Sequence, residues 1–416
     1  MRLPRPLFLT LALAVSRALA ADAPADQPKE WIDPDTGHRI VRLTDEPGSA
    51  SLYFHQNAFT PEGDKMIIVT PEGLSTIDLK TRAIEWVAPG VRYSMGASSG
   101  IEVGRKTRTV YYQKRVDDHT VLYATNVDTK ATREIATLPF VGDFGGVSAD
   151  ETLIVGKTGV PGGRRGRGNR MLEFFTVNIQ TGEVKTFFPS HDNLNHIQSS
   201  PTDPAMVLFC HEGEWHEVDR IWTIHTDGSG LRLMQKRTIP YEIAGHEFFS
   251  HDGQMIWYDL QTPRSVEFWV AGVNVYTGER IRYPVTREEW SVHYAVSWDG
   301  KLFSGDGGGP DGVANLTPLP DAKPLDPPVD NKWMYLFTPT NDPPGTMKDG
   351  TEDVKVGHFT VEKLVNMAKH DYNKRTGVEP NGMFTPDGKW IVFRSKMQGN
   401  ALQVYEVEVA KAGAKS

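Results

Sequence analysis

The sequence has one cysteine, no surplus of basic residues and, after its first 20 residues, no long apolar run. A single cysteine, Cys210, excludes a disulfide framework and any zinc site made of several cysteines. It ends the apolar run Met206–Cys210, so we expect it to be a buried core residue. The net charge of −8 argues against a nucleic-acid-binding protein, because phosphate contacts need an excess of Lys and Arg.

The start of the chain has the features of a secretion signal. A basic beginning precedes the apolar run Leu7–Val15, which is too short to span a bilayer. The small residues of Ala18-Leu-Ala then form a cleavage pattern. We therefore expect residues 1–20 to be a signal peptide. Residues 21–416 are expected to form one domain in the periplasm or outside the cell, without contact to a membrane.

The rest of the chain is organised by a repeat. Each copy is a turn with Asp or Glu beside Gly, followed by a short alternating strand, as in Phe249-Ser-His-Asp-Gly-Gln-Met-Ile-Trp-Tyr. These turns fall near positions 63, 104, 151, 204, 253, 300 and 388. A spacing of roughly 40–50 residues with short strands is typical of a β-propeller. The anchors predict seven blades, and the long last gap indicates insertions.

The last repeat is too short to hold a full blade. It ends with the strand Leu402–Val409, whereas an unassigned strand lies near residues 38–44. We expect this early strand to complete the last blade, because ring closure removes an exposed sheet edge. The predicted fold is therefore an all-β, seven-bladed propeller closed by an N-terminal strand. One exception is Thr360–His370, where the apolar spacing predicts a helix.

One loop has a composition unlike the rest of this acidic chain. The segment Pro161–Arg170 carries four arginines in a glycine-rich frame. It is either an arm that attracts a polyanion or a solvated loop without a partner.

Histidines recur at matching places in successive repeats. His246 and His293 each lie seven residues before the glycine of their turn. Equal offsets place both side chains at the same depth in the central channel, on neighbouring blades. The same offset in the last repeat gives Asn381, with Glu379 on the same strand face.

Further polar residues extend this pattern to a ring at one channel mouth. They are His55, His196, Gln198 and His211. Such a ring suits a divalent metal ion, since imidazole and carboxylate ligands bind Mn²⁺ and similar ions. It equally suits a general base, because histidine titrates near neutral pH. For any one histidine, the alternative is a structural role in holding strands together.

The motifs around these residues resemble the oligogalacturonate lyase family over most of the chain. They are Tyr53-Phe-His-Gln-Asn, Phe209-Cys-His-Glu-Gly, Val218-Asp-Arg-Ile-Trp, His246-Glu-Phe and Phe384-Thr-Pro-Asp. The resemblance implies a seven-bladed propeller that cleaves oligouronides by β-elimination. It also implies that His246 is the general base, Arg220 the catalytic arginine and His293 a metal ligand.

We predict that the other ring residues, His211, His196, Gln198 and His55, bind the acidic oligosaccharide. The last blade departs from the family, whose His-Pro-His motif is replaced here by Glu379-Pro-Asn, with Thr376 in place of a glutamine. The predicted metal ligands are thus His293, Glu379 and Asn381. Two outcomes remain open: a divalent site for Mn²⁺ or a harder ion such as Ca²⁺, or a lost site with Arg220 neutralising the substrate.

Two other functions compete with a lyase. A non-catalytic propeller would bind sugars or envelope proteins without turnover, and the altered metal motif favours it. A glycoside hydrolase needs two carboxylates across the scissile bond. Glu247 and Glu379 are candidates, but nothing in their spacing pairs them, so the hydrolase ranks last.

Overall fold

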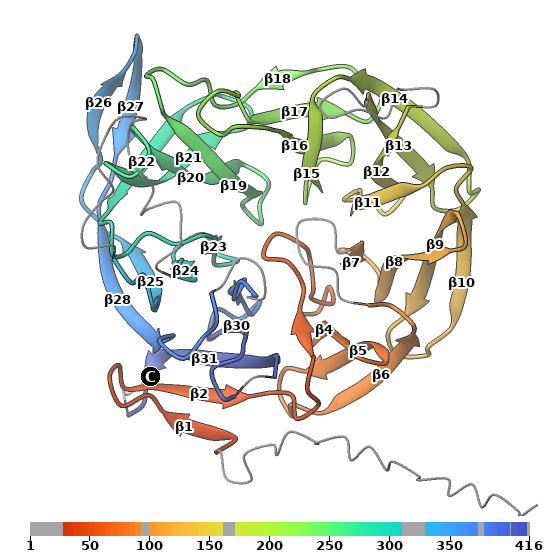
Figure 1. Ribbon diagram of the computed structural model, residues 1–416, viewed down its shortest axis with the longest axis horizontal. Coiled ribbons are helices and arrows are strands. Elements are labelled where there is room, and N and C mark those ends of the chain that lie inside the picture. The colour runs from red at the N-terminus through yellow and green to blue at the C-terminus, as the bar shows by residue number, and fades with distance from the viewer. Residues whose placement is uncertain are drawn as a thin grey trace, which may run out of the picture.

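The computed structural model describes residues 28–92, 100–160, 171–309, 329–372, 378–399 and 401–413. Within these ranges the regular elements are all β-strands, which form seven sheets around a central axis (Figure 1). The predicted seven-bladed propeller is confirmed. No helix suited to crossing a membrane occurs in this part of the chain. The predicted signal peptide, the arginine-rich loop 161–170 and Thr376 lie outside the described residues.

Blades 1 to 4 are antiparallel four-stranded sheets in chain order. Blade 1 consists of β3 (Ala50–Ser51), β4 (Lys65–Thr70), β5 (Gly73–Asp78) and β6 (Ile84–Pro89). Blade 2 consists of β7 (Ile101–Val103), β8 (Thr109–Val116), β9 (His119–Asn126) and β10 (Thr132–Thr137). Blade 3 consists of β11 (Gly142–Val147), β12 (Leu153–Gly159), β13 (Leu172–Asn178) and β14 (Val184–Ser190). Blade 4 consists of β15 (Asn193–Ser199), β16 (Met206–Glu212), β17 (Ile221–His225) and β18 (Arg232–Leu233).

The other three blades exchange strands with distant parts of the chain. Blade 5 consists of β19 (Ile243–Phe249), β20 (Met255–Gln261), β21 (Phe268–Asn274) and β22 (Arg280–Val285), extended by β26 (Gly345–Asp349) and β27 (Glu352–Val356). Blade 6 consists of β23 (Tyr294–Val296), β24 (Phe303–Gly305), β25 (Trp333–Pro339) and β28 (Phe359–Asn366). Blade 7 consists of β29 (Met383–Phe384), β30 (Trp390–Ser395), β31 (Gln403–Lys411), β2 (His38–Arg42) and β1 (Glu30–Ile32).

In four of the repeats the anchor turn is held by a bond from a Ser or Thr hydroxyl to the aspartate two residues later. Ser250 Oγ donates to Asp252 Oδ1 at 2.5 Å, and Thr385 Oγ1 donates to Asp387 Oδ1 at 2.7 Å. In the turn that contains Ser250 and Asp252, Gly253 adopts a φ of +70°, a backbone conformation that glycine adopts without steric cost. The conserved turn chemistry inside this one chain explains why the repeat is visible in its sequence.

The ring is closed by the N-terminal strand, as predicted. Strand β2 pairs antiparallel with β31, with Ile40 opposite Val407 and Arg42 opposite Tyr405. Figure 1 shows the first and last strands of the described chain, β1 and β31, on either side of β2 in this blade. Apolar layers between blades support the ring: one buried cluster contains Val392 of blade 7, Ile68 of blade 1 and Val103 of blade 2.

The predicted helix at Thr360–His370 is wrong, because most of that segment is strand β28. A β-bulge causes the misleading spacing. Met334 pairs with Val365 and Tyr335 with Lys363, so Leu364 is an extra residue on β28. One extra residue shifts the alternation by one position, and the apolar side chains then fall at helix-like intervals.

The excursion between β25 and β28 forms the hairpin β26–β27, which packs onto the neighbouring blade. Strand β27 runs parallel to β22, with Ile281 opposite Lys355. Asp349 at the hairpin tip forms ion pairs with Arg280 and Arg282, and all three side chains are nearly buried. The hairpin therefore ties blade 6 to blade 5.

Candidate active site

The inner strands of blades 4 and 5 carry matching bulges that redirect two histidines. In β19, Gly245 pairs with Asp259 and Phe248 with Trp257, so His246 and its neighbour share one partner residue. His246 adopts a φ of +51°, in the left-handed region that histidine enters more readily than most residues. Bulges of this kind re-aim a side chain and are common beside active sites.

Two other predicted residues occupy equivalent positions. His196 has a φ of +48° in the bulge of β15, and Asn381 has a φ of +52° just before β29. The seven-residue offset therefore led to Asn381. In the fourth repeat the same offset before Pro204 gives Ile197, one residue after His196. The three residues share a local conformation that turns the side chain away from the strand ladder.

Four of the predicted histidines form one cluster near the axis. The ring centroids of His246 and His293 are 4.7 Å apart, and those of His196 and His246 are 5.9 Å apart. His55 lies 5.9 Å from His196 by the same measure. Blades 4, 5 and 6 and the loop after β3 therefore deliver imidazoles to a shared place, and the equal offsets predicted this for His246 and His293.

Two aromatic residues that precede His55 fill the space between these imidazoles. The ring of Phe54 lies 4.6 Å from that of His293. Tyr53 contacts the rings of His55 and His196 at 5.0 and 5.9 Å, and its hydroxyl lies 3.2 Å from His293 Nε2. Burial raises the pKa of Tyr53 well above its usual value, and Glu379 and Glu247 add to this effect. The phenol is therefore protonated at neutral pH.

His293 is oriented by a buried carboxylate. Asp306 accepts a bond from the backbone N–H of His293 at 2.9 Å, and its other oxygen lies 2.8 Å from the ring Nδ1. Burial alone would lower the pKa of His293, but Asp306 and Glu379 raise it above its usual value. The imidazole Nε2 is left facing Tyr53 and the carboxylate of Glu379, which is 3.6 Å away.

The electrostatic environment of His246 differs from that of His293. Burial lowers the pKa of His246 well below its usual value, and the charges of His293, His196, Arg220 and His55 lower it further. An imidazole in this setting stays neutral at physiological pH, so it can accept a proton.

Arg220 lies next to this base but does not touch it. Its guanidinium is 1% exposed and donates to Glu212 Oε1 at 2.9 Å and to Cys210 Sγ at 3.6 Å. It also lies over the ring of Trp215 at 4.4 Å, and Trp215 in turn contacts His246 at 5.2 Å. The ring of Trp215 therefore contacts both the guanidinium of Arg220 and the imidazole of His246.

The structure places two of the predicted substrate-binding residues differently from the others. The ring of His211 stacks on Trp222 at 5.0 Å, and its Nδ1 lies 3.6 Å from Asp192; these partners lie outside the histidine cluster. Gln198 is buried and donates to the backbone oxygen of Glu247 at 2.7 Å. His55 and His196 are the members of this group that the structure brings to the cluster.

The predicted metal ligands His293, Glu379 and Asn381 lie next to one another. The side-chain oxygen of Asn381 accepts a bond from the backbone of Phe54 at 2.9 Å, and its amide donates to the backbone of Glu379 at 3.0 Å. The side chain of Asn381 therefore bonds to the backbone on both sides, and its oxygen keeps a second lone pair. His293 Nε2 lies 3.6 Å from the Glu379 carboxylate.

Sequence reasoning missed Tyr53 and Asp306 as site residues. Tyr53 could have been predicted from the sequence, because it begins the same motif that contains His55. Asp306 had no such signal: it comes 13 residues after His293 and follows the neighbouring strand β24. Only the pairing of β23 with β24 brings its carboxylate under the imidazole.

His55 of the cluster also lines a partly open cavity of about 60 Å³. Gln198, Glu102, Arg105 and His251 are among its other lining residues. A cavity of this size holds a few water molecules.

Comparisons with known proteins identify the family of the chain. A family model described as oligogalacturonate lyase matches residues 168–412. An oligogalacturonate lyase of Dickeya dadantii is 26% identical over 390 residues, 88% of this chain and 92% of that protein. An oligogalacturonide lyase of Pectobacterium atrosepticum is 27% identical over 242 residues, 56% of this chain and 54% of that protein.

Solved structures agree on the fold. A crystal structure of an oligogalacturonate lyase from Vibrio parahaemolyticus superposes with a TM-score of 0.72 at 20% identity, covering 92% of this chain and 96% of that one. An oligogalacturonate lyase in complex with manganese gives a TM-score of 0.71 at 21% identity with the same coverage.

Proposed function

Since the chain belongs to the oligogalacturonate lyase family and is a polysaccharide lyase, we propose that it cleaves short oligogalacturonate-like uronides by β-elimination. The observation that carries the proposal is the cluster of His246, His293 and Tyr53 beside the charge of Arg220. These groups meet the needs of this reaction, which removes a proton next to a carboxylate and expels a glycosidic oxygen.

His246 is the proposed general base. Its neutral imidazole takes the proton from C5 of the uronate, and the electrons of that C–H bond form the C4–C5 double bond as the C4–O bond breaks. A correctly placed base contributes about 10²–10⁴-fold to such a step. The left-handed bulge fixes the direction of the imidazole, which limits the reorganisation needed before reaction.

Arg220 supplies positive charge near the carboxylate of the substrate. Removing the C5 proton turns this group into a dianion-like enolate, whose charge needs stabilisation in a site that excludes water. Arg220 is held in place by Glu212 and Trp215, so its charge is preorganised. A protonated His293, favoured by Asp306, adds a second positive charge on the other side of His246.

Tyr53 is the proposed proton donor to the leaving oxygen. Its phenol is protonated at neutral pH, and its hydroxyl contacts His293 Nε2, from which it regains a proton after turnover. The manganese named for one relative belongs to that protein, and we assign no step of this reaction to a metal.

The proposal is tested by the ultraviolet absorbance of the unsaturated uronate product. Purified protein is offered a panel of oligogalacturonates, and His246→Gln is compared with His225→Gln, an outer-blade histidine bonded to Ser229. We expect kcat/KM to fall by about 10²–10⁴-fold in the first variant and to stay unchanged in the second. A folded wild-type chain that produces no unsaturated product from any of the substrates would refute the proposal.

The signal-peptide prediction adds a location to this proposal. Cleavage after Ala20 would deliver the enzyme to the periplasm or the medium. N-terminal sequencing of the protein recovered outside the cytoplasm tests this point, and a mature chain that still begins at Met1 contradicts it.

A further inference from the structure

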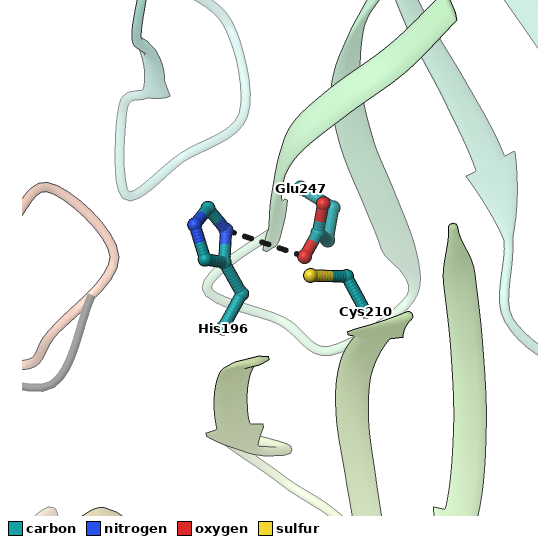
Figure 2. Close-up of side chains that lie close together, drawn as sticks. All are labelled: His196, Cys210 and Glu247. Carbon is teal, nitrogen blue, oxygen red and sulfur yellow. Dashed lines mark ion pairs between the residues drawn. The ribbon is translucent and has the colours of Figure 1, made fainter. Parts of the chain in front are cut away.

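A second group of ligand atoms converges behind the histidine cluster, between blades 4 and 5. His196, Cys210 and Glu247 each offer one atom, and these atoms lie within 4.8 Å of one another. Figure 2 shows the imidazole, the thiol and the carboxylate turned toward a common point. None of the three residues is a predicted metal ligand, and the set shares no residue with His293, Glu379 and Asn381.

All three side chains are buried. His196 is 7% exposed, and Cys210 and Glu247 are 0% exposed. His196 Nδ1 and both carboxylate oxygens of Glu247 have no hydrogen-bond partner among the described residues. Nδ1 lies 3.3 Å from Glu247 Oε1, close enough for an ion pair but without hydrogen-bond alignment.

The carboxylate of Glu247 is the main anomaly, because it is buried with an ion pair to His196 but without a hydrogen bond among the described residues. Burial favours its neutral form, but His196 and Arg220 together hold the pKa of Glu247 below the usual value. The guanidinium of Arg220 donates to Glu212 and Cys210 instead. A buried carboxylate without hydrogen bonds is costly, and buried charges are normally paired or bound to a metal.

We propose that His196 Nδ1, Cys210 Sγ and the Glu247 carboxylate bind one divalent transition-metal ion of the zinc type. Nitrogen, thiolate and carboxylate together suit zinc better than manganese or calcium, which prefer oxygen. A tetrahedral zinc ion holds its ligand atoms about 3.5 Å apart, so a small inward movement of the three groups is sufficient. Three protein ligands leave the fourth position open.

The local structure supports this site. Cys210 lies in the regular part of β16 opposite Asn195, whereas His196 and Glu247 come from the bulges of β15 and β19. The bond from Gln198 to the backbone oxygen of Glu247 fixes one bulge relative to the other. The proposal does not rest on the lyase reaction, because it concerns a binding site that can be measured without substrate.

The test uses the full-length protein, without an affinity tag and stripped by a chelator, titrated with Zn²⁺ or Co²⁺ alone. Cys210 is the single cysteine of the chain, so a cobalt–thiolate charge-transfer band in the wild type places the ion on this residue. We expect that band with one equivalent of Co²⁺, and binding of one Zn²⁺ by calorimetry. No band, or no zinc binding, overturns the proposal.

Variants then locate the other ligands. Cys210→Ser should abolish the cobalt band, and Glu247→Gln should weaken zinc binding at least tenfold, while His225→Gln should bind as the wild type does. Zinc should also raise the melting temperature of the wild type but not that of Cys210→Ser. Zinc affinity unchanged in both site variants overturns the proposal. If a variant does not fold, the cobalt band of the wild type still decides the matter.

Discussion

Replacing Asp306 by Asn should change the pH dependence of a residue that Asp306 does not touch. Asp306 holds His293 by two bonds and raises the pKa of this imidazole. A charged His293 in turn lowers the pKa of His246, as does burial, which has the larger effect. In Asp306→Asn, His293 loses much of its positive charge, so we expect the pKa of His246 to rise toward 6.5.

The size of this effect follows from the distance between the two imidazoles. Their centroids are 4.7 Å apart, where a unit charge is worth about 3.5 kcal/mol at an effective dielectric constant of about 20. That energy equals about 2.5 pKa units. Glu379 still faces His293 in the variant and preserves part of its charge, so we expect a rise of at least about one unit.

The assay is the acid limb of kcat/KM against pH, measured with an oligogalacturonate substrate. This limb reports the pKa of the base in the free enzyme. It should lie below pH 6.5 in the wild type and move upward in Asp306→Asn. Asp299→Asn, which alters an exposed turn of the same blade, is the matched control.

Proton NMR of the imidazoles gives the pKa of His246 without turnover, which matters if the variant is nearly inactive. An acid limb and an NMR titration that both stay in place, or move to lower pH, would refute the coupling of His293 to His246.

Three further predictions concern other parts of the molecule. Tyr53→Phe should lower kcat by about 10²–10⁴-fold with little change in KM, and a change in KM alone would contradict a proton-transfer role. Burial raises the pKa of Asp259 to about 7 although Trp290 donates to its carboxylate. The folded state then binds more protons than the unfolded state, so the free energy of unfolding should fall as the pH rises from about 4 to 7. Asp259→Asn should remove up to about 4 kcal/mol of this fall, as measured by urea unfolding at each pH. Asp349→Ala should cost about 3–5 kcal/mol because the buried Arg282 loses its ion-pair partner and Arg280 keeps only Glu352. Lys348→Ala, at an exposed pair, should cost less than about 1 kcal/mol in the same assay.

The propeller was predictable because its repeat is made of local chemistry. Four anchor turns pair a hydroxyl with the aspartate two residues later, and most carry a glycine, so the sequence shows the blade period directly. The closing strand followed from a missing strand at the other end of the chain. The hairpin β26–β27 was not predictable, because its pairing with β22 depends on contacts between residues about 70 positions apart.

The candidate site was predictable only in part. Equal offsets from the anchor turns placed His246 and His293 together because the blades are structurally equivalent. Asp306 was missed because its link to His293 depends on strand pairing rather than on a shared motif. The helix at Thr360–His370 was predicted wrongly because a single bulge residue, Leu364, altered the period of a strand.

The left-handed backbone position in the inner strands can hold different functional side chains without a change in the strand itself. His196, His246 and Asn381 occupy it in three blades, each held by the backbone of its own strand. The amino acids that accept this conformation are few, chiefly glycine, asparagine, aspartate and histidine. Three of these four carry the groups that proteins use to move protons or grip ions. A single substitution at such a point thus converts one blade from architecture to chemistry, or back again, while the surrounding ring keeps its shape.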